Sequence, residues 1–436
     1  QLLLILLVVA VPCLFMGCAF PVGFRALLAT YVPGGTLGRA AGLAAAASSV
    51  GNLLGAPLFY LGLWANQGSR ACLLLSAAFV AAVTVIVGPS AVARRAGALV
   101  LAAVLAVASM SAWDIAILSS GPFLYGPLYL GAASEGQSLP EAIHQRGEVA
   151  LAIEGPQALV TVRRAMNGAL SMQVNGKTDA STTGDMKIQS LIAHLPLLMH
   201  SSSRGGVAGN VLVIGLGSGV TVGSALSHPV LRVDVVEISR EVLEAASLFE
   251  EANRGALHDP RTRVILGDAR THMMFASGPV APAYDVIASQ PSNPWIAGEA
   301  ILFTREFFEL ARRRLAPGGI LCQWLQGYGL SPEDFRSVVS TFMQVFPHSS
   351  LWEESTAGGD YLLLGSDAPL AIDPRRLAEA MGRMSIARDL SRIEVDGPAD
   401  LLSLFVAEGA RLGNLAAGAP IQTQDRLSLE HTAPPA

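Results

Sequence analysis

Three glycines follow a strongly apolar run near the middle of the chain, and an acid closes the next apolar run. The run NVLVI precedes Gly215, Gly217 and Gly219, and Glu237 ends the run RVDVVE. Glycines after a strand let the backbone turn tightly and approach a ligand without side-chain obstruction. A carboxylate at the end of the next strand is where ribose hydroxyls bind in nucleotide-binding α/β domains. The spacing therefore predicts a nucleotide-type cofactor.

A second acid occupies the corresponding place after the third apolar run. Asp268 and Ala269 follow TRVILG, so the Asp268 carboxylate is placed to bind an adenine amine and Ala269 to offer a backbone N–H. The alternative is that Asp268 is a helix N-cap. Because the glycines read G-L-G-S-G rather than G-x-G-x-x-G, they favour an S-adenosylmethionine type of cofactor over a dinucleotide.

The elements that must position these residues alternate between strand and helix. Apolar, β-rich runs recur through this half of the chain, at 210–219, 232–238, 262–269, 284–289 and 319–325. Such alternation predicts a parallel sheet with helices on both faces, a Rossmann-like domain over residues 201–370. Ligands of these sheets bind beyond the carboxyl ends of the strands, where the predicted site residues gather.

Different patterns flank this domain. Residues 114–144 are rich in Gly, Pro, Ser and Tyr and are interpreted as a connecting segment, with a re-entrant membrane segment as the alternative. Three short runs with β character lie between Gly147 and Gly176, which predicts a small antiparallel β-domain over 145–200. Residues 371–436 are expected to form a helical or irregular C-terminal extension.

The first 113 residues have the composition of membrane spans. Apolar stretches of roughly the length that crosses a bilayer as helix predict four spans, at 1–24, about 40–64, 71–88 and 97–113. These stretches contain no acid, Lys or His, which argues against independent transport activity. The chain starts at Gln1 without a charged region before the first apolar stretch, so we interpret it as an N-terminally truncated fragment rather than a cleaved signal peptide.

Charge is divided unevenly along the chain. The first 113 residues carry five arginines and no acid, which is a charge of +5. Because the net charge of the whole chain is −5, the remaining residues carry a net charge of −10. An acidic soluble half disfavours nucleic acid and attracts cations such as polyamines. The arginine positions would place this half outside the cell by the positive-inside rule, whereas a cofactor made in the cytosol places it inside, which we favour. The four cysteines have no metal-ligand spacing, so neither zinc nor a disulfide is predicted.

Several separate motifs resemble the spermidine synthase family, in particular its bacterial branch with a synthase-like domain fused to membrane spans. The similarity covers residues 145–366, and its motifs are VNGKTDASTTGDMKIQSLIAHLPLLMH (174–200), VLVIGLGSG, DVIASQPSNPW (285–295) and LFTREFFELARRRLAPGGILCQW (302–324). The resemblance implies a small β-domain followed by a methyltransferase-like sheet. It also implies decarboxylated S-adenosylmethionine as co-substrate, a polyamine or other amine as acceptor, and a homodimer as an open option.

Residue by residue, the resemblance supports a cofactor pocket. Glu237 matches the ribose-binding acid, Asp268 and Ala269 match the adenine-binding pair, and His194 matches a polyamine-contacting histidine. The alternative for His194 is a structural hydrogen bond to a neighbouring loop. Trp295 is expected to close over the thioether, to form a wall of the acceptor pocket, or to belong to the core.

Three positions depart from the family in the same sense. Gln290 stands where the family has its catalytic Asp, Ser218 where an Asp of the glycine loop holds the aminopropyl amine, and Asn293 where a second acid contacts polyamine. Aminopropyl transfer requires binding of cationic amines and removal of a proton, so these losses weaken ordinary spermidine synthesis. Acids elsewhere are candidates to compensate, with a solvated surface role as the alternative for each, namely Asp179, Asp185, Glu299, Asp360 and Asp425.

Three functions remain open on the sequence. The first is aminopropyl transfer from decarboxylated S-adenosylmethionine to an amine, with Gln290 and Asn293 at the catalytic position. The second is methylation with intact S-adenosylmethionine, suggested by the three neutral replacements. The third is a membrane sensor that binds a polyamine or nucleoside without turnover.

Overall fold

The computed structural model describes residues 37–57, 65–87, 90–110, 112–205, 208–275, 283–296, 298–354 and 359–432. The chain divides into two compact units, residues 1–113 and residues 114–436. Each unit is described by itself.

The first unit is helical. Its described helices are α2 (Leu37–Pro57), α3 (Ala65–Val87) and α4 (Ala91–Ser109). Gly68–Ile86 and Ala91–Ser109 are each long and apolar enough to cross a bilayer. These two stretches overlap the predicted spans at 71–88 and 97–113, whereas 1–24 lies outside the described residues and only part of 40–64 lies within α2.

Close backbone contact joins α3 to α4. A Cβ added to Gly97 would lie 3.0 Å from the carbonyl oxygen of Ala81, so a larger residue at this position would separate the two helices. Arg70 binds the last carbonyls of α4, with Nη2 lying 3.1 Å from the oxygen of Val107 and 2.9 Å from that of Met110. The arginine thus donates to carbonyls at the C-terminal end of α4, where the Val107 oxygen also accepts from the N–H of Met110 at 3.2 Å.

The second unit begins with helices where the sequence predicted a connecting segment. They are α5 (Ile115–Leu118), α6 (Pro122–Ser134) and α7 (Leu139–His144). A sheet of four antiparallel strands follows, β1 (Glu148–Glu154), β2 (Leu159–Arg164), β3 (Leu170–Val174) and β4 (Lys177–Ser181). The fourth strand was not among the three predicted runs, because KTDAS is polar and carries no alternation.

The main sheet contains the five predicted strands in parallel. They are β5 (Asn210–Ile214), β6 (Arg232–Glu237), β7 (Thr262–Leu266), β8 (Tyr284–Ser289) and β9 (Leu315–Gln326), paired in the order β9-β8-β5-β6-β7. The chain leaves β5 toward β6 and β7 and returns to β8 on its other side. Strand order therefore reverses between β5 and β8, where ligands of such sheets bind.

Three further strands make the sheet mixed. They are β10 (His348–Glu354), β11 (Asp360–Ser366) and β12 (Phe405–Glu408), which extend the β9 edge in the order β12-β10-β11-β9 by antiparallel pairing. The sequence predicted a parallel sheet, and that prediction is wrong for these three strands, which pair antiparallel. Because β11 runs opposite to β9, Asp360 at its start lies at the carboxyl end of the parallel strands, paired with Gln326.

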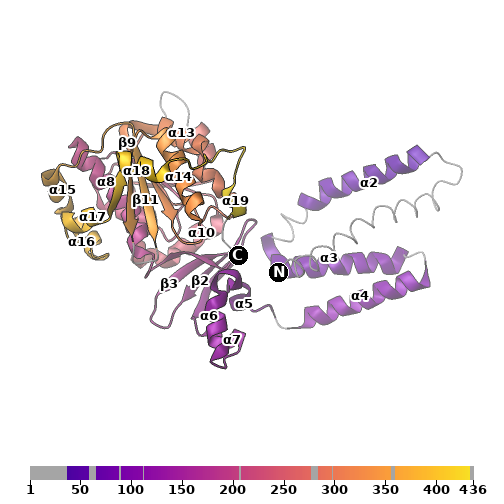
Figure 1. The fold of residues 1–436 in the computed structure, drawn as a ribbon. Coiled ribbons are helices and arrows are strands. Elements are labelled where there is room, and N and C mark those ends of the chain that lie inside the picture. Colours follow the sequence, from indigo (N-terminus) through magenta and orange to yellow (C-terminus); the bar gives the residue numbers. More distant parts are fainter. Residues whose placement is uncertain are drawn as a thin grey trace. The chain divides into compact units, whose positions relative to one another are not determined.

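Helices cover both faces of the main sheet, as predicted. Residues of α13 (Arg305–Arg314), α14 (Pro332–Val345) and α18 (Gly409–Ala416) pack on one face. On the other face lie α8 (Met186–Arg204), α9 (Val220–Ser227), α10 (Arg240–Ala245), α15 (Pro374–Met381) and α16 (Met384–Ser391). The remaining short helices are α11 (Glu250–Asn253), α12 (Ala269–Phe275), α17 (Pro398–Ser403) and α19 (Leu429–Thr432). In Figure 1, α13, α14 and α18 lie across the strands from α8 and α15.

Candidate active site at the carboxyl edge of the sheet

The glycine loop turns sharply at the end of β5. Gly215, Gly217 and Gly219 have φ values of 85°, 51° and 80°, the left-handed region that side chains disfavour. A Cβ at Gly215 would lie 2.7 Å from the carbonyl oxygen of Gln290. The loop therefore brings the ends of β5 and β8 into direct contact and leaves its backbone open to a ligand.

Glu237 holds the same loop from the neighbouring strand. Its carboxylate accepts hydrogen bonds from the backbone N–H of Leu216 and of Ser239, both at 2.8 Å. Burial raises the pKa of Glu237, and the Ser239 and Leu216 N–H groups oppose that shift. Glu237 thus ends β6 beside the glycine loop and shapes that loop, and its binding of a ribose stays a prediction.

The predicted adenine pair is next to Glu237. The N–H of Gly267 donates to the carbonyl of Glu237 at 2.8 Å, which ties the loop after β7 to the end of β6. Oδ1 of Asp268 accepts from the N–H of Thr271 at 2.7 Å, an N-cap contact, and Ala269 is the buried first residue of α12. The Asp268 carboxylate has two oxygens, so capping α12 through Oδ1 is compatible with the predicted contact to an adenine amine.

Ser218 and Gln290 share a network of neutral groups. The buried Ser218 hydroxyl donates to Oε1 of Gln189 on α8. Oγ1 of Thr221 lies 2.8 Å from the carbonyl of Gln189 and 2.9 Å from Oε1 of Gln290. The three-way contact joins the glycine loop, α8 and the loop after β8 without a charged group.

Asn293 and Trp295 lie in the loop after β8. Asn293 is fully buried, and Tyr328 lies next to its amide. Trp295 is half-buried, packs against the core, and touches the chain at Gly329, where an added Cβ would lie 2.9 Å from its ring. The predicted alternatives for Trp295 are therefore not exclusive, since the ring belongs to the core and also borders this loop.

Two acids that the sequence named as substitutes lie beside the same loop. Asp179 on β4 pairs with Lys177 and accepts a hydrogen bond of 2.8 Å from Ser292. Glu299 accepts a hydrogen bond from the backbone N–H of Ser292. Burial and then the charge of Asp179 raise the pKa of Glu299 to about 7, with Glu237 adding to the shift and Lys177 opposing it.

A second acidic group surrounds Asp360. Burial raises its pKa to about 6, the hydrogen bond from Nε1 of Trp324 opposes the shift, and the charges of Asp185 and Glu354 add to it. Sequence reasoning missed Glu354, because the antiparallel strand β10 that brings it to the site was not predicted. It also missed Gln326 and Tyr328, which lie at the end of β9 and just after it. Asp425 is exposed on a C-terminal loop and takes no part in either group.

His194 lies toward the opposite edge of the sheet. Its side chain is fully buried, with Nδ1 at 2.9 Å from Nε2 of His228 and Nε2 at 3.0 Å from Oδ2 of Asp389. His228 ends α9 and lies four residues before the start of β6, so this network sits near the amino ends of the strands. Burial lowers the pKa of His194, although the Asp389 carboxylate opposes that shift. The polyamine contact of His194 stays a prediction, whereas its structural hydrogen bond is present.

Asp389 is the centre of that buried network. Although burial alone would raise its pKa, the bond and charge of His194 and the charge of Arg254 lower it. The carboxylate contacts Nη1 of Arg254 at 2.7 Å and Nη1 of Arg392 at 3.0 Å. We expect Asp389→Ala to lower the free energy of unfolding by about 2 kcal/mol, less than for a fully buried pair because both arginines are a third exposed.

Thermal and denaturant unfolding of the full chain in detergent would measure this loss. Asp396→Ala is the matched control, because Asp396 is exposed and its carboxylate accepts a hydrogen bond from the Ser391 hydroxyl nearby in the chain. An Asp389→Ala variant as stable as the control would contradict a stabilising role for the network.

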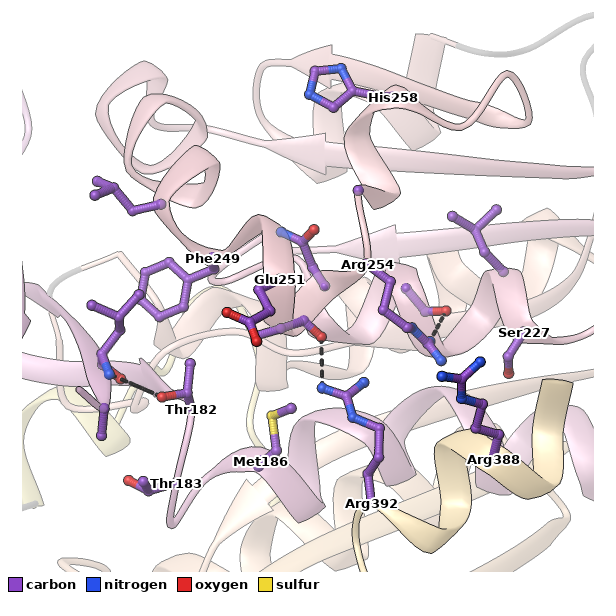
Figure 2. A pocket seen from close by; sticks show the side chains of 18 of the residues that line it. Thr182, Thr183, Met186, Ser227, Phe249, Glu251, Arg254, His258, Arg388 and Arg392 are labelled. Carbon is purple, nitrogen blue, oxygen red and sulfur yellow. Dashed lines mark hydrogen bonds between the residues drawn. The ribbon is translucent and has the colours of Figure 1, made fainter. Parts of the chain in front are cut away.

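A cavity of about 1200 Å³ lies apart from these residues. It is lined by the β2–β3 turn, the start of α8, α9, the α10–α11 region and α16, and none of the predicted site residues borders it. Figure 2 shows Arg254, Arg388 and Arg392 close together in this cavity. Arg254 and Arg392 are already bound to Asp389, so the cavity is not the candidate active site.

Comparison with known proteins identifies a known domain in this part of the chain. The family model for the spermine/spermidine synthase domain matches residues 186–352. Spermidine synthase from Dictyostelium discoideum is 28% identical over 176 residues, 40% of this chain and 58% of its own length. Putrescine N-methyltransferase 2 from Nicotiana tabacum is 29% identical over 179 residues, 41% of this chain and 48% of its own. The chain thus spans about half the length of these relatives.

The solved structures agree on the fold. Spermidine synthase from Thermotoga maritima superimposes with a TM-score of 0.51 at 17% identity, covering 62% of this chain and 87% of that one. The superimposed part of the chain is longer than the part matched by the family model, and its fold is spermidine synthase-like and of the Rossmann type. The comparisons thus identify residues 186–352 as a spermine/spermidine synthase domain.

Proposed function

We propose that the chain transfers an aminopropyl group from decarboxylated S-adenosylmethionine to an amine acceptor, anchored to a membrane by its first unit. The observation that carries the proposal is the pair Asp179 and Glu299 around Ser292, beside the Gln290 position. These acids supply, from other elements, the negative charge that Gln290, Asn293 and Ser218 no longer provide. Relatives named as spermidine synthases support the reaction class.

The residues present fit the proposed donor. Glu237 would bind the ribose hydroxyls, Asp268 and Ala269 the adenine, and the open backbone of Gly215 to Gly219 the remainder. Decarboxylated S-adenosylmethionine is an alkylating sulfonium. The intact form carries an additional carboxylate, which Asp179, Glu237 and Glu299 would repel. Their charges favour the decarboxylated form.

The acceptor must lose a proton before it attacks. An amine that is cationic in water binds between Asp179 and Glu299 and passes its proton to the Glu299 carboxylate. The neutral nitrogen then attacks the carbon next to the sulfonium, the carbon–sulfur bond breaks, and its electron pair leaves with the thioether. The amide of Gln290, held by Thr221, can orient the amine but cannot take the proton.

Gln326 gives independent support for a polar acceptor. Its side chain is fully buried at the end of β9, and its amide has no hydrogen-bond partner among the residues that the structure describes. A buried amide without a partner costs stability unless a ligand or water completes it. An amine reaching from Glu299 toward Asp360 would be such a ligand.

Methyl transfer is the second candidate. Ser218 is neutral and buried, so the glycine loop offers no carboxylate to an aminopropyl amine. Relatives named as putrescine N-methyltransferases match over a similar length. The acceptor would be the same kind of amine, and Glu299 would again remove its proton.

Titration of the full chain in detergent with each donor separates the candidates. We expect decarboxylated S-adenosylmethionine to bind at least about tenfold more tightly, which is ~1.4 kcal/mol. Mass spectrometry of products with putrescine should show an aminopropyl adduct. Tighter binding of the intact form together with a methylated product would establish methyl transfer instead. Binding without product from either donor would indicate a sensor.

A further inference from the structure

The cavity that lies apart from the candidate active site is more positive than the unit that contains it. Its lining includes five arginines and two acids, namely Arg164, Arg254, Arg261, Arg388, Arg392, Glu251 and Asp259. Asp259 pairs with Arg261, and Glu251 makes no ion pair with any residue that the structure describes. Residues 114–436 as a whole have a net charge of −10. A confined basic cavity in an acidic unit favours a small anion over an extended polyanion such as nucleic acid.

Two of these arginines are held rigidly by the protein. Nη1 of Arg254 lies 2.7 Å from Oδ1 of Asp389, and its Nη2 donates to the carbonyl of Gly223. Nη1 of Arg392 lies 3.0 Å from the same carboxylate oxygen, and its Nη2 donates to the carbonyl of Ala252 at 3.0 Å. Guanidiniums that are fixed before a ligand arrives lose little conformational freedom when it binds.

A third arginine has no counter-ion in the described part of the chain. Arg388 makes no hydrogen bond or ion pair there, and Figure 2 shows its guanidinium close to those of Arg254 and Arg392. Burial lowers the pKa of Arg254, Asp389 opposes that shift, and the charges of Arg392 and Arg388 add to it. Three guanidiniums thus share the single charge of Asp389, which leaves an excess of two positive charges.

The backbone at Arg254 supports a role for its side chain. Arg254 follows α11 with a φ of 61°, in the left-handed region where glycine is the usual residue because a Cβ is unfavourable. Gly255 comes one position later, so the chain has an arginine where a glycine would avoid the strain. Strained residues of this kind are frequent at ligand sites. Here the strained position places a guanidinium in the cavity wall.

We propose that this cavity binds a phosphate group through Arg254, Arg388 and Arg392. A phosphate presents a tetrahedron of oxygens and about two negative charges, which matches three guanidiniums with an excess of two positive charges. A carboxylate has only two oxygens and one charge. The cavity of about 1200 Å³ has room for an organic body beyond the phosphate, toward Met186 and Phe249. The phosphate therefore belongs either to the inorganic ion or to a small organic phosphate.

This ligand differs from those of the proposed reaction. The sulfonium donor and the amine acceptor are cations, which the arginines would repel and which the acids Asp179 and Glu299 attract. None of the predicted site residues borders the cavity. The phosphate site is thus a second binding site, separate from group transfer.

Calorimetric titration of the full chain in detergent at pH 8 tests the site. The probes are inorganic phosphate and glycerol 3-phosphate, with sodium chloride of equal ionic strength as the reference. We expect saturable binding, and Arg388→Gln should weaken it at least about tenfold, which is ~1.4 kcal/mol. Arg388→Lys keeps the charge and should recover part of the affinity. Arg411→Gln is the matched control, because Arg411 is exposed on α18 and lies outside the cavity.

Thermal unfolding separates anion binding from a structural role of Arg388. Without phosphate, Arg388→Gln should unfold at the wild-type temperature or above it, because a repulsive charge is removed. Phosphate should raise the wild-type midpoint more than that of the variant. Tighter binding of glycerol 3-phosphate would identify an organic phosphate, and equal affinities would identify the phosphate group alone as the ligand. No saturable binding, or binding that Arg388→Gln leaves unchanged, would overturn the proposal. Neither measurement uses a donor or an acceptor, so both are independent of the proposed function.

Discussion

Replacing Glu299 by Gln should lower kcat by about 10²–10⁴-fold, since general-base catalysis is typically worth that much. Gln keeps the shape and the hydrogen bond that Ser292 donates, but it cannot accept the proton of the acceptor amine. We expect KM for the amine to rise by a smaller factor, because Asp179 still supplies negative charge at the same loop. Steady-state kinetics with putrescine and decarboxylated S-adenosylmethionine would measure both effects.

The dependence of kcat on pH gives the more specific signature. The pKa of Glu299 is raised to about 7, first by burial and then by the charge of Asp179. The base form is therefore the minority below pH 7, and wild-type kcat should rise through this region and level off above it. In Glu299→Gln the corresponding rise should disappear, and in Glu299→Asp part of the activity should return.

Stability provides the control on folding. Above pH 7 the native protein contains a buried charged Glu299, which its raised pKa shows to be unfavourable there, and Gln removes that cost. The midpoint of thermal unfolding at pH 8 should therefore stay equal or increase in the variant. Glu309→Gln, on the exposed side of α13, is the matched control for Glu299→Gln, and we expect it to keep wild-type activity. A Glu299→Gln enzyme with normal kcat and the wild-type pH profile would exclude Glu299 as the base.

The parallel half of the site follows from local sequence patterns. The run NVLVI is continuous and apolar and RVDVVE is rich in valine because both faces of their strands are buried; the glycines follow the first run and Glu237 ends the second. Parallel strands expose their carboxyl ends at one edge, so Gly215, Glu237, Asp268 and Gln290 had to meet there once the strand pattern was recognised. This part of the site needed no tertiary information beyond the fold class.

The acidic half depends on tertiary pairing. Asp179 comes from a polar strand of the small sheet, and Asp360 from a strand that pairs antiparallel with β9. Neither pairing has a local signal, so the sequence could name both acids only among several candidates and could not distinguish them from Asp425. For His194 the local motif matched the family, but the motif did not reveal its hydrogen-bond partners. These are His228 and Asp389, which come from other segments of the chain.

Replacing Glu237 by Gln should weaken binding of the donor by at least about 100-fold and also loosen the glycine loop. Both carboxylate oxygens accept backbone N–H groups, from Leu216 and Ser239. A Gln side chain has one acceptor oxygen, so its NH₂ group must face a backbone donor and that N–H loses its partner. An unpaired buried donor costs about 1–3 kcal/mol, in addition to the lost charge-assisted bonds to the ribose.

The measurement must separate these two losses, because a disordered loop would by itself abolish donor binding. Calorimetric titration gives the affinity for the donor, and hydrogen exchange at Leu216 and Ser239 reports whether their N–H groups are still protected. Glu241→Gln is the matched control, since that buried acid binds the Ser239 hydroxyl at 2.7 Å without contacting the glycine loop. Weak binding with full protection would assign Glu237 to the ribose alone. Loss of protection would show that the carboxylate first builds the loop that the donor then occupies, and normal affinity would remove Glu237 from the site.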